Sequence, residues 1–180
     1  MPGKVVDGPL TSLLGGRCAI GHLRLGQCQE NLFAAVPNPG IMRTVHVEEI
    51  NIGPSEALAP VESVTAVAGK GLAGDRHFTD NPDPGNALTL IEAETLEDVG
   101  LTGAQSRRQV VVRGVRLNDL IGKRFRVGDV ECLGVEICEP CRHLQELTRP
   151  GIIKDLIHRG GLNADILSGG TISVGDEVSL

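Results

Sequence analysis

The sequence predicts a mostly β protein whose short strands form a closed or nearly closed barrel, with a few short peripheral helices. Three observations predict this class. The 180 residues include 24 Gly and 10 Pro, more than an average chain carries, so the chain turns often. The β-like runs are short and recur at roughly 8–12-residue spacing. No strand–helix alternation has the length that βαβ units need, which excludes a Rossmann fold.

Residue patterns define the expected elements in order. Residues 44–52 alternate and then change phase across Glu48-Glu49, as a strand with a bulge does. Further strands are expected at 61–67, 87–91, 109–113, 125–127 and 130–137, with two last strands around Gly169-Gly170 and Gly175-Asp176. Helices are expected at 92–99, 117–121, 140–147 and 152–159, with Gly100 and Gly160 ending the first and the last. Gly128-Asp129 and Gly175-Asp176 each predict a tight turn, because glycine adopts positive φ.

The first part of the chain differs from the rest. Residues 1–41 lack sustained periodicity of either 2 or 3.6 and finish in the breaker-rich run Pro37-Asn38-Pro39-Gly40. We therefore expect residues 1–41 to be a poorly ordered N-terminal extension and residues 42–180 to be the folded domain. The alternative is a functional module built on Cys18 and Cys28, whose spacing has no accompanying His pattern.

Composition excludes several classes of function. The net charge of −6 and the aromatic content of 2% disfavour binding to DNA or RNA. No apolar run approaches the ~20 residues that a membrane-spanning helix needs, so no membrane association is expected. The five cysteines are an odd number and no export signal precedes them, which indicates reduced thiols and a cytoplasmic protein.

The segment Cys138-Glu-Pro-Cys141-Arg-His143 is the most informative of the chain. A β-like run leads into it, and Pro140 is suited to the first turn of a helix. Cys141 would then lie in that first turn, near unpaired backbone N–H groups and beside Arg142 and His143. These conditions favour a thiolate, which could attack a substrate, carry sulfur or bind a soft metal.

Other interpretations of this segment stay open. A structural zinc site needs four ligands, and only Cys132 and His143 accompany the C-x-x-C pair. A thioredoxin-type redox pair matches C-x-P-C after a strand, but too few residues follow Cys141 to complete that fold. Two buried, inert cysteines are the third alternative. We favour an active Cys141 thiolate in a ligand pocket.

A second constellation is basic. The segment Lys70-Gly-Leu-Ala-Gly74-Asp-Arg76-His77 is a glycine loop with three cationic or potentially cationic side chains. Arg107, Arg108 and Arg113 flank an expected strand, and Arg159 precedes Gly160. Exposed backbone N–H groups and forked guanidinium groups suit an anion such as phosphate. The alternative is ordinary solvated charge. Asp75 either orients a neighbouring side chain or belongs only to the turn. No P-loop motif is present in the sequence.

Together these motifs resemble a known family. Eight pieces match the MOSC domain (molybdenum cofactor sulfurase C-terminal domain) in family order: Gly71-Leu-Ala-Gly-Asp-Arg-His77, Leu88-Thr-Leu-Ile-Glu92, Arg107-Arg-Gln-Val-Val-Val-Arg-Gly114, Leu120-Ile-Gly122, Phe125-Arg-Val-Gly-Asp129, Cys138-Glu-Pro-Cys141, Arg159-Gly-Gly161 and Gly169-Gly-Thr-Ile-Ser-Val-Gly-Asp176. The resemblance covers nearly all of residues 42–180. Gln109 departs from it, since the family usually has Asn there.

The resemblance implies a barrel-like β fold and a pocket for the molybdenum cofactor (molybdopterin), whose pterin carries a phosphate. It implies that Cys141 is the catalytic residue and the molybdenum ligand or sulfur carrier. The residues expected to bind the cofactor are Lys70, Gly74, Arg76, His77, Arg107, Arg108, Arg159 and Gly160. Such proteins reduce N-hydroxylated compounds or deliver sulfur. The resemblance thus implies an oxidoreductase that takes electrons from a separate protein, or else a non-catalytic carrier of persulfide sulfur or of the cofactor.

Overall fold

The computed structural model describes residues 45–180. The expected extension 1–41 and the alternative Cys18/Cys28 module lie outside the described residues. The strands are β1 (His46–Ile52), β2 (Ala59–Val61), β3 (Ser63–Val67), β4 (Gly71–Leu72), β5 (Leu88–Glu92), β6 (Val110–Arg113), β7 (Arg124–Val127), β8 (Val130–Ile137), β9 (Leu162–Ile166), β10 (Gly170–Ser173) and β11 (Val178–Ser179). The helices are α1 (Ala93–Val99), α2 (Gly103–Ser106), α3 (Arg142–Leu147) and α4 (Ile152–Leu156), with a 3₁₀ turn at Leu117–Leu120.

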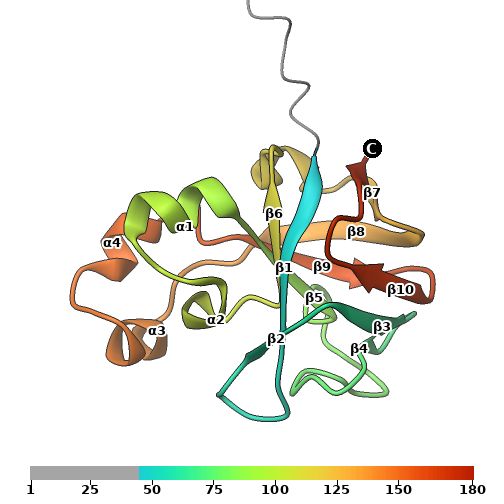
Figure 1. Ribbon diagram of the computed structural model, residues 1–180, viewed down its shortest axis with the longest axis horizontal. Helices are drawn as coiled ribbons and strands as arrows, with labels where there is room; N and C mark the ends of the chain where they lie inside the picture. Colours follow the sequence, from blue (N-terminus) through green and yellow to red (C-terminus); the bar gives the residue numbers. More distant parts are fainter. Residues whose placement is uncertain (1–44) are drawn as a thin grey trace, which may run out of the picture. The chain divides into compact units, whose positions relative to one another are not determined.

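Two sheets organise the domain. The larger has the order β11-β7-β8-β9-β5-β6-β1-β2, and the smaller has the order β10-β3-β4. The larger sheet curls strongly into a half-barrel (Figure 1), and its outer strands β11 and β2 do not pair with each other. The mostly β class is therefore confirmed, but the barrel is not fully closed.

The bulge in β1 and the turn between β7 and β8 lie where the sequence predicts them. The pairing of β1 with β6 shifts register between Val47 and Glu49, at the expected bulge. Strands β7 and β8 form a hairpin in which Val127 pairs with Val130. Gly128 has a φ of 58° in that two-residue turn, which suits glycine because it has no Cβ. Both bulge and hairpin are thus fixed by local sequence.

Apolar side chains of the larger sheet form the core. Leu88 and Leu90 of β5, Val110 and Val112 of β6 and Leu162 of β9 are all completely buried on the same side. Alternation places every second residue of a strand on that side. Burial of each such side chain contributes roughly 1.5–3 kcal/mol to stability. The core thereby fixes the strands from which the loops of the candidate site, described below, extend.

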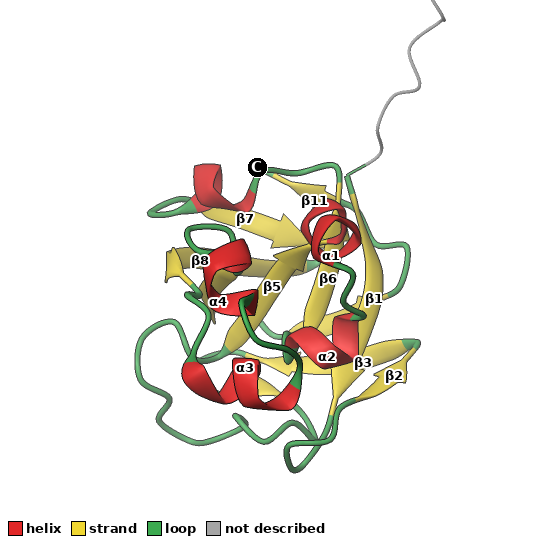
Figure 2. Ribbon diagram, turned by 90° about the vertical axis from the view of Figure 1, so that its left-hand side faces the viewer, coloured by secondary structure: helices red, strands yellow, loops and turns green. Residues whose placement is uncertain are grey.

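The α-helices of residues 45–180 lie together on one side of the strands (Figures 1 and 2). Helix α1 ends at Gly100 in the left-handed conformation, as predicted. Helices α3 and α4 are shorter than predicted, and for α4 long-range hydrogen bonds of His158 explain the early end. The His158 carbonyl accepts a hydrogen bond from the Asn118 side chain, and the His158 backbone N–H donates one to the Glu139 carboxylate. These bonds replace those that would continue α4 to Arg159.

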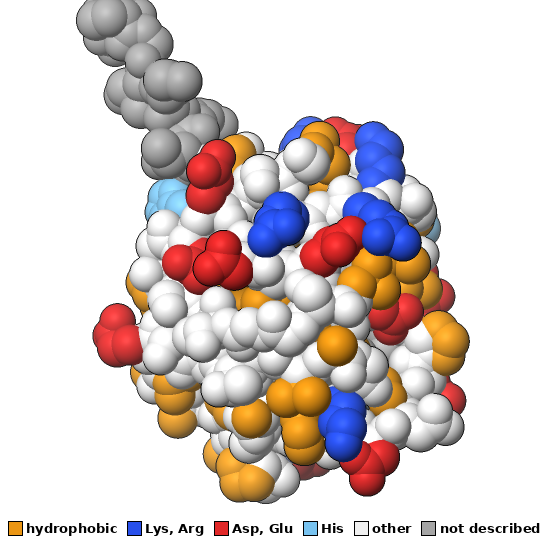
Figure 3. Space-filling model, turned by 90° about the vertical axis from the view of Figure 1, so that its right-hand side faces the viewer, with side chains coloured by type: hydrophobic (Ala, Val, Ile, Leu, Met, Phe, Trp, Pro, Cys, Tyr) orange, Lys and Arg blue, Asp and Glu red, His pale blue; other side chains and the backbone are white. Residues whose placement is uncertain are grey.

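The opposite face carries the smaller sheet. Charged side chains of both signs are interspersed with hydrophobic ones on this face (Figure 3). Within residues 45–180, no helix is both long and apolar enough to span a membrane.

Candidate cofactor site

A buried aspartate shapes the glycine turn that carries Arg76 and His77. The Asp75 carboxylate accepts hydrogen bonds from the His77 N–H at 2.9 Å and from Gln109 Nε2 at 2.6 Å. The Gln109 carboxamide in turn accepts from the Thr89 N–H at 2.8 Å. Gly74 has a φ of 85° at the bend. Asp75 therefore orients the turn against β5 and β6, and a glutamine at position 109 supplies the carboxamide that this contact needs.

Arg76 holds three segments together. Its guanidinium donates to His77 Nε2 at 3.0 Å, to the Ser55 carbonyl at 3.4 Å and to the Arg107 carbonyl at 3.2 Å. Burial lowers the pKa of Arg76, and the positive charges of Arg107 and Arg108 act in the same direction, opposed by Asp75. Guanidinium groups nevertheless stay charged in proteins. A partly buried positive charge thus lies where the turn meets the loop after β1.

His77 accepts the hydrogen bond from Arg76, so its ring must be neutral at that nitrogen. Burial lowers the pKa of His77, and the neighbouring Arg76 charge lowers it further. The geometry and the direction of the pKa shift therefore agree.

We expect His77 to titrate below the ordinary value of 6.5 when its ring protons are followed by NMR. An imidazole with a lowered pKa stabilises the fold fully above pH 6.5, and this contribution is lost as the pH falls through the lowered pKa. The variant Arg76→Gln should move the pKa of His77 upward, because it removes a positive charge and a donor. Titration of His77 at or above 6.5 in the unmodified protein would contradict this arrangement.

Arg107 carries a buried donor without an acceptor. The residue follows α2 and adopts a left-handed backbone conformation, with a φ of 64°. Its Nη1 atom is buried and has no hydrogen-bond partner. The nearest carboxylate is that of Glu56, 4.0 Å away. A buried charged donor that lacks an acceptor is unfavourable, so this position suits an anionic ligand group.

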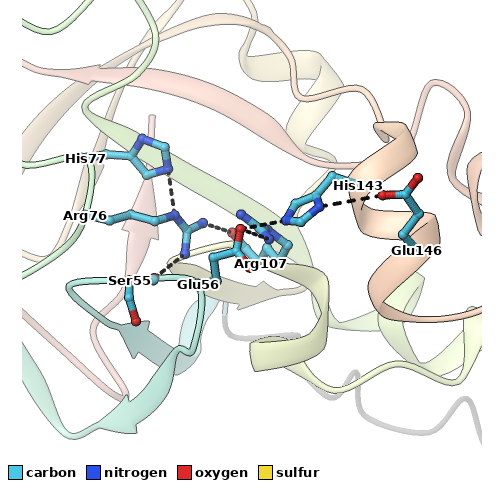
Figure 4. Close-up of polar contacts among 7 residues, drawn as sticks. All are labelled: Ser55, Glu56, Arg76, His77, Arg107, His143 and Glu146. Carbon is cyan, nitrogen blue, oxygen red and sulfur yellow. Dashed lines mark hydrogen bonds and ion pairs between the residues drawn. The ribbon is translucent and has the colours of Figure 1, made fainter.

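Glu56 and His143 complete one side of the cluster (Figure 4). The Glu56 carboxylate lies 2.9 Å from His143 Nε2, although the two residues are far apart in the sequence. His143 belongs to the first turn of α3, and Cys141 is the residue immediately before that helix. The cluster of Arg76, His77 and Arg107 is therefore joined to the Cys141 segment through Glu56.

Arg108 faces the backbone rather than an open pocket. Its guanidinium is buried and donates to the carbonyls of Ser106, Cys138 and Gly160 at 3.1, 3.1 and 2.9 Å. A Cβ on Gly160 would lie 2.5 Å from the Cys138 carbonyl oxygen, so only glycine allows this approach. Arg108 and Gly160 hence fix the start of the Cys138–Cys141 loop.

The three described cysteines differ in accessibility. Cys132 is completely buried, Cys138 is half-buried and Cys141 is exposed. Burial raises the pKa of Cys132 to about 12 and also raises that of Cys138. Cys141 lies one residue before α3, in an extended conformation, rather than inside its first turn as the sequence suggests. The cause is the preceding loop, which is tied to Gly161 through the Cys138 N–H.

Two of the residues expected to bind the cofactor, Arg159 and Lys70, contact other partners in the structure. Arg159 pairs with Asp98 at 3.0 Å and lines a separate pocket of about 390 Å³ with Glu92 and Glu94. Those two carboxylates accept hydrogen bonds from the backbone N–H groups of the loop that follows β6. Lys70 forms an exposed ion pair with Asp80 at 2.6 Å. The structure therefore brings Arg76, His77 and Arg107 together but directs Arg159 and Lys70 to other partners.

Sequence reasoning did not single out Ser55 or Glu56. Gly53 allows the loop to fold tightly on itself, because a Cβ there would lie 2.2 Å from the Ala57 carbonyl oxygen. No motif marks Glu56, and only the tertiary structure shows that it reaches His143. Across residues 45–180, no group of three or more His, Cys, Asp and Glu side chains is arranged to hold a metal ion.

Comparison with known families decides the relationship. The model of the MOSC domain matches residues 84–179. The chain belongs to the MOSC domain family. The matched region contains Arg107 and the Cys138–Cys141 loop, whereas Arg76 and His77 precede it.

Solved structures share the MOSC fold at low sequence identity. YuaD from Bacillus subtilis matches with a TM-score of 0.65 and 17% identity, over 75% of this chain and 94% of that one. YiiM from Geobacillus stearothermophilus matches with a TM-score of 0.59 and 17% identity, over 76% and 74%. YiiM from Escherichia coli matches with a TM-score of 0.56 and 17% identity, over 74% and 68%. No curated protein is significantly similar to the chain in sequence.

Proposed function

We propose that this MOSC domain binds the molybdenum cofactor and reduces N-hydroxylated compounds with electrons from a separate protein. Arg76, His77 and Arg107 would face the anionic part of the cofactor, and the Cys141 thiolate would be the molybdenum ligand. The family to which the chain belongs supports the choice of cofactor. The arrangement of the chain's own side chains supports the site.

The buried Nη1 atom of Arg107 carries this proposal. It is a charged donor without an acceptor, and the partly buried guanidinium of Arg76 donates to the same residue's carbonyl. An anionic group placed here would gain a charge-assisted hydrogen bond, and burial of the donor would limit competition from water. These residues therefore fit a phosphorylated cofactor.

Cys141 suits the proposed role of ligand to the molybdenum of the cofactor. It is exposed, and its segment is held by Arg108 and Gly160 rather than by its own side chain. Thiolates are preferred ligands of soft metals. When bound, the cofactor would supply the two-electron redox chemistry. Reduction of R–NHOH then consumes two electrons and two protons, breaks the N–O bond and yields R–NH₂ and water.

The remaining predicted residues would contribute in two ways. Gly74 and Gly160 shape the backbone next to Arg76 and Cys138. Lys70 and Arg159 would have to leave their present partners, Asp80 and Asp98, to contact the cofactor. We therefore propose a smaller contribution from these two side chains than from Arg107.

The test is the molybdenum content and turnover of protein made in a cofactor-competent host. We expect bound molybdenum and reduction of 6-hydroxylaminopurine with an artificial reductant. Arg107→Asn should weaken cofactor retention about tenfold or more, since a charge-assisted hydrogen bond contributes ~1.5–3 kcal/mol. Asparagine is chosen because it tolerates the left-handed conformation.

Arg126→Asn is the matched control, because it makes the same substitution at an exposed arginine whose guanidinium donates to the Asp129 carbonyl. It should retain the cofactor. Protein without molybdenum would contradict the proposal. A persulfide on Cys141 without turnover would instead identify a sulfur carrier.

A further inference from the structure

Glu56 occupies an unusual position among the cations of the site. Its carboxylate lies 2.9 Å from His143 Nε2 and 4.0 Å from Arg107 Nη1 (Figure 4). The Arg107 side chain is only 17% exposed, whereas that of Glu56 is 65% exposed. A solvent-exposed carboxylate is therefore the nearest negative charge to a buried, unsatisfied guanidinium nitrogen.

The loop that carries Glu56 is fixed close to its base. The Gly53 carbonyl accepts from the Arg76 N–H at 2.8 Å, and the Ser55 carbonyl accepts from the Arg76 guanidinium at 3.4 Å. Gly53 also packs against the Ala57 carbonyl. Because the backbone is held on both sides of residue 54, the Glu56 carboxylate can leave by rotation of its side chain, without opening of the loop.

The contact between Glu56 and Arg107 is too long for a hydrogen bond. Glu56 thus lies close enough to offset the Arg107 charge but does not satisfy its Nη1 atom. An incoming anion that hydrogen-bonds to Nη1 would lie no more than about 7 Å from the Glu56 carboxylate. Two negative charges at such a separation in a partly buried site repel each other, which favours rotation of the carboxylate away from Arg107.

We infer that Glu56 is a built-in competitor for the oxyanion position beside Arg107, so that its side chain gates the binding of an anionic ligand group. This inference rests on the proposed function, because the ligand group is taken to be the phosphate of the cofactor. Glu56 acts by placing its negative charge beside the site in the absence of ligand and by turning away from Arg107 and His143 when ligand binds. It thereby lowers the affinity for free phosphate and other small oxyanions.

The experiment measures binding of inorganic phosphate to the metal-free, full-length protein by titration calorimetry. Glu56→Gln keeps the size of the side chain and removes its charge. We expect it to bind phosphate about threefold or more tightly than the unmodified protein, the scale of an exposed ion pair. In an Arg107→Asn background, Glu56→Gln should bring no gain, since the competing position is gone.

Glu62→Gln is the matched control. It makes the same change of charge at an exposed residue between β2 and β3 that has no side-chain contact with the site. Its phosphate affinity should equal that of the unmodified protein. The inference is overturned if Glu56→Gln shows no measurable phosphate binding, if it binds no more tightly, or if Glu62→Gln gives the same gain.

The two proposals can fail separately. Molybdenum retention without a gain in Glu56→Gln would remove the gate and leave the proposed function. A gain in phosphate affinity without molybdenum in the purified protein would remove the proposed function and leave an anion site gated by Glu56.

Discussion

Arg108→Ala is expected to destabilise the domain by about 3 kcal/mol or more. The Arg108 guanidinium is buried and donates to three carbonyls, those of Ser106, Cys138 and Gly160. Each hydrogen bond from a charged group contributes roughly 1.5–3 kcal/mol, and carbonyls left without a partner in the interior add a penalty. The free energy of unfolding in urea measures the loss. Arg108→Lys should recover little, because one ammonium group cannot reach three separated acceptors.

Arg126→Ala provides the comparison for this measurement. The Arg126 side chain is exposed on β7, so its removal should change stability by about 0.5 kcal/mol or less. If Arg108→Ala is as stable as Arg126→Ala, the buried guanidinium does not hold the loop. Cys141 would then depend on other contacts for its position.

The elements that could be predicted are those with local causes. The bulge of β1 follows from the change of phase at Glu48-Glu49, and the hairpin of β7 and β8 follows from Gly128-Asp129. The end of α1 follows from Gly100. In each case, the residues that determine the geometry lie within a few positions of it, so the sequence pattern contains the whole signal.

Pairing between distant strands could not be predicted in the same way. Strand β9 lies between β8 and β5, and β5 runs parallel to β6 across the α1–α2 connection. A sequence pattern indicates that a strand has a buried face but not which strand lies beside it. Strand β11 does not pair with β2, and residues 175–178 instead form backbone hydrogen bonds with the start of β1. The incomplete closure of the barrel therefore also depends on contacts between distant segments. Local sequence patterns therefore could not predict that the barrel stays open.

The candidate site likewise contains some residues that local patterns predict and others that only the fold brings there. The glycine turn indicated Arg76 and His77, and the arginine pair indicated Arg107, because glycine–arginine patterns are typical of anion sites. The neighbouring Arg108 points to backbone carbonyls. Arg107 ends α2 in a left-handed conformation, so its side chain and that of Arg108 project in different directions. The sequence alone does not tell which of the two arginines faces the ligand. Glu56 reaches the site only through the fold.

The Cys141 thiol is expected to be the reactive one, and its removal should abolish molybdenum binding. Cys141 is exposed, whereas burial raises the pKa of Cys138 and raises that of Cys132 to about 12. A raised pKa leaves less of a thiol in the reactive thiolate form at neutral pH, and burial also keeps the reagent away from Cys132 and Cys138. Iodoacetamide should therefore label Cys141 first in the metal-free protein between pH 5 and 9, when the modified peptides are quantified separately.

Cysteine-to-serine variants connect this reactivity to the cofactor. Cys141→Ser should lose nearly all bound molybdenum, because a hydroxyl is a poor ligand for a soft metal. Cys138→Ser should keep most of it, since Arg108 binds the Cys138 backbone carbonyl and not its sulfur. Faster labelling of Cys138 at pH 6 would contradict the assignment, as would a Cys141→Ser protein that keeps its molybdenum. If Cys138 labels faster, the loop held by Arg108 and Gly160 has to open to expose the half-buried Cys138 thiol.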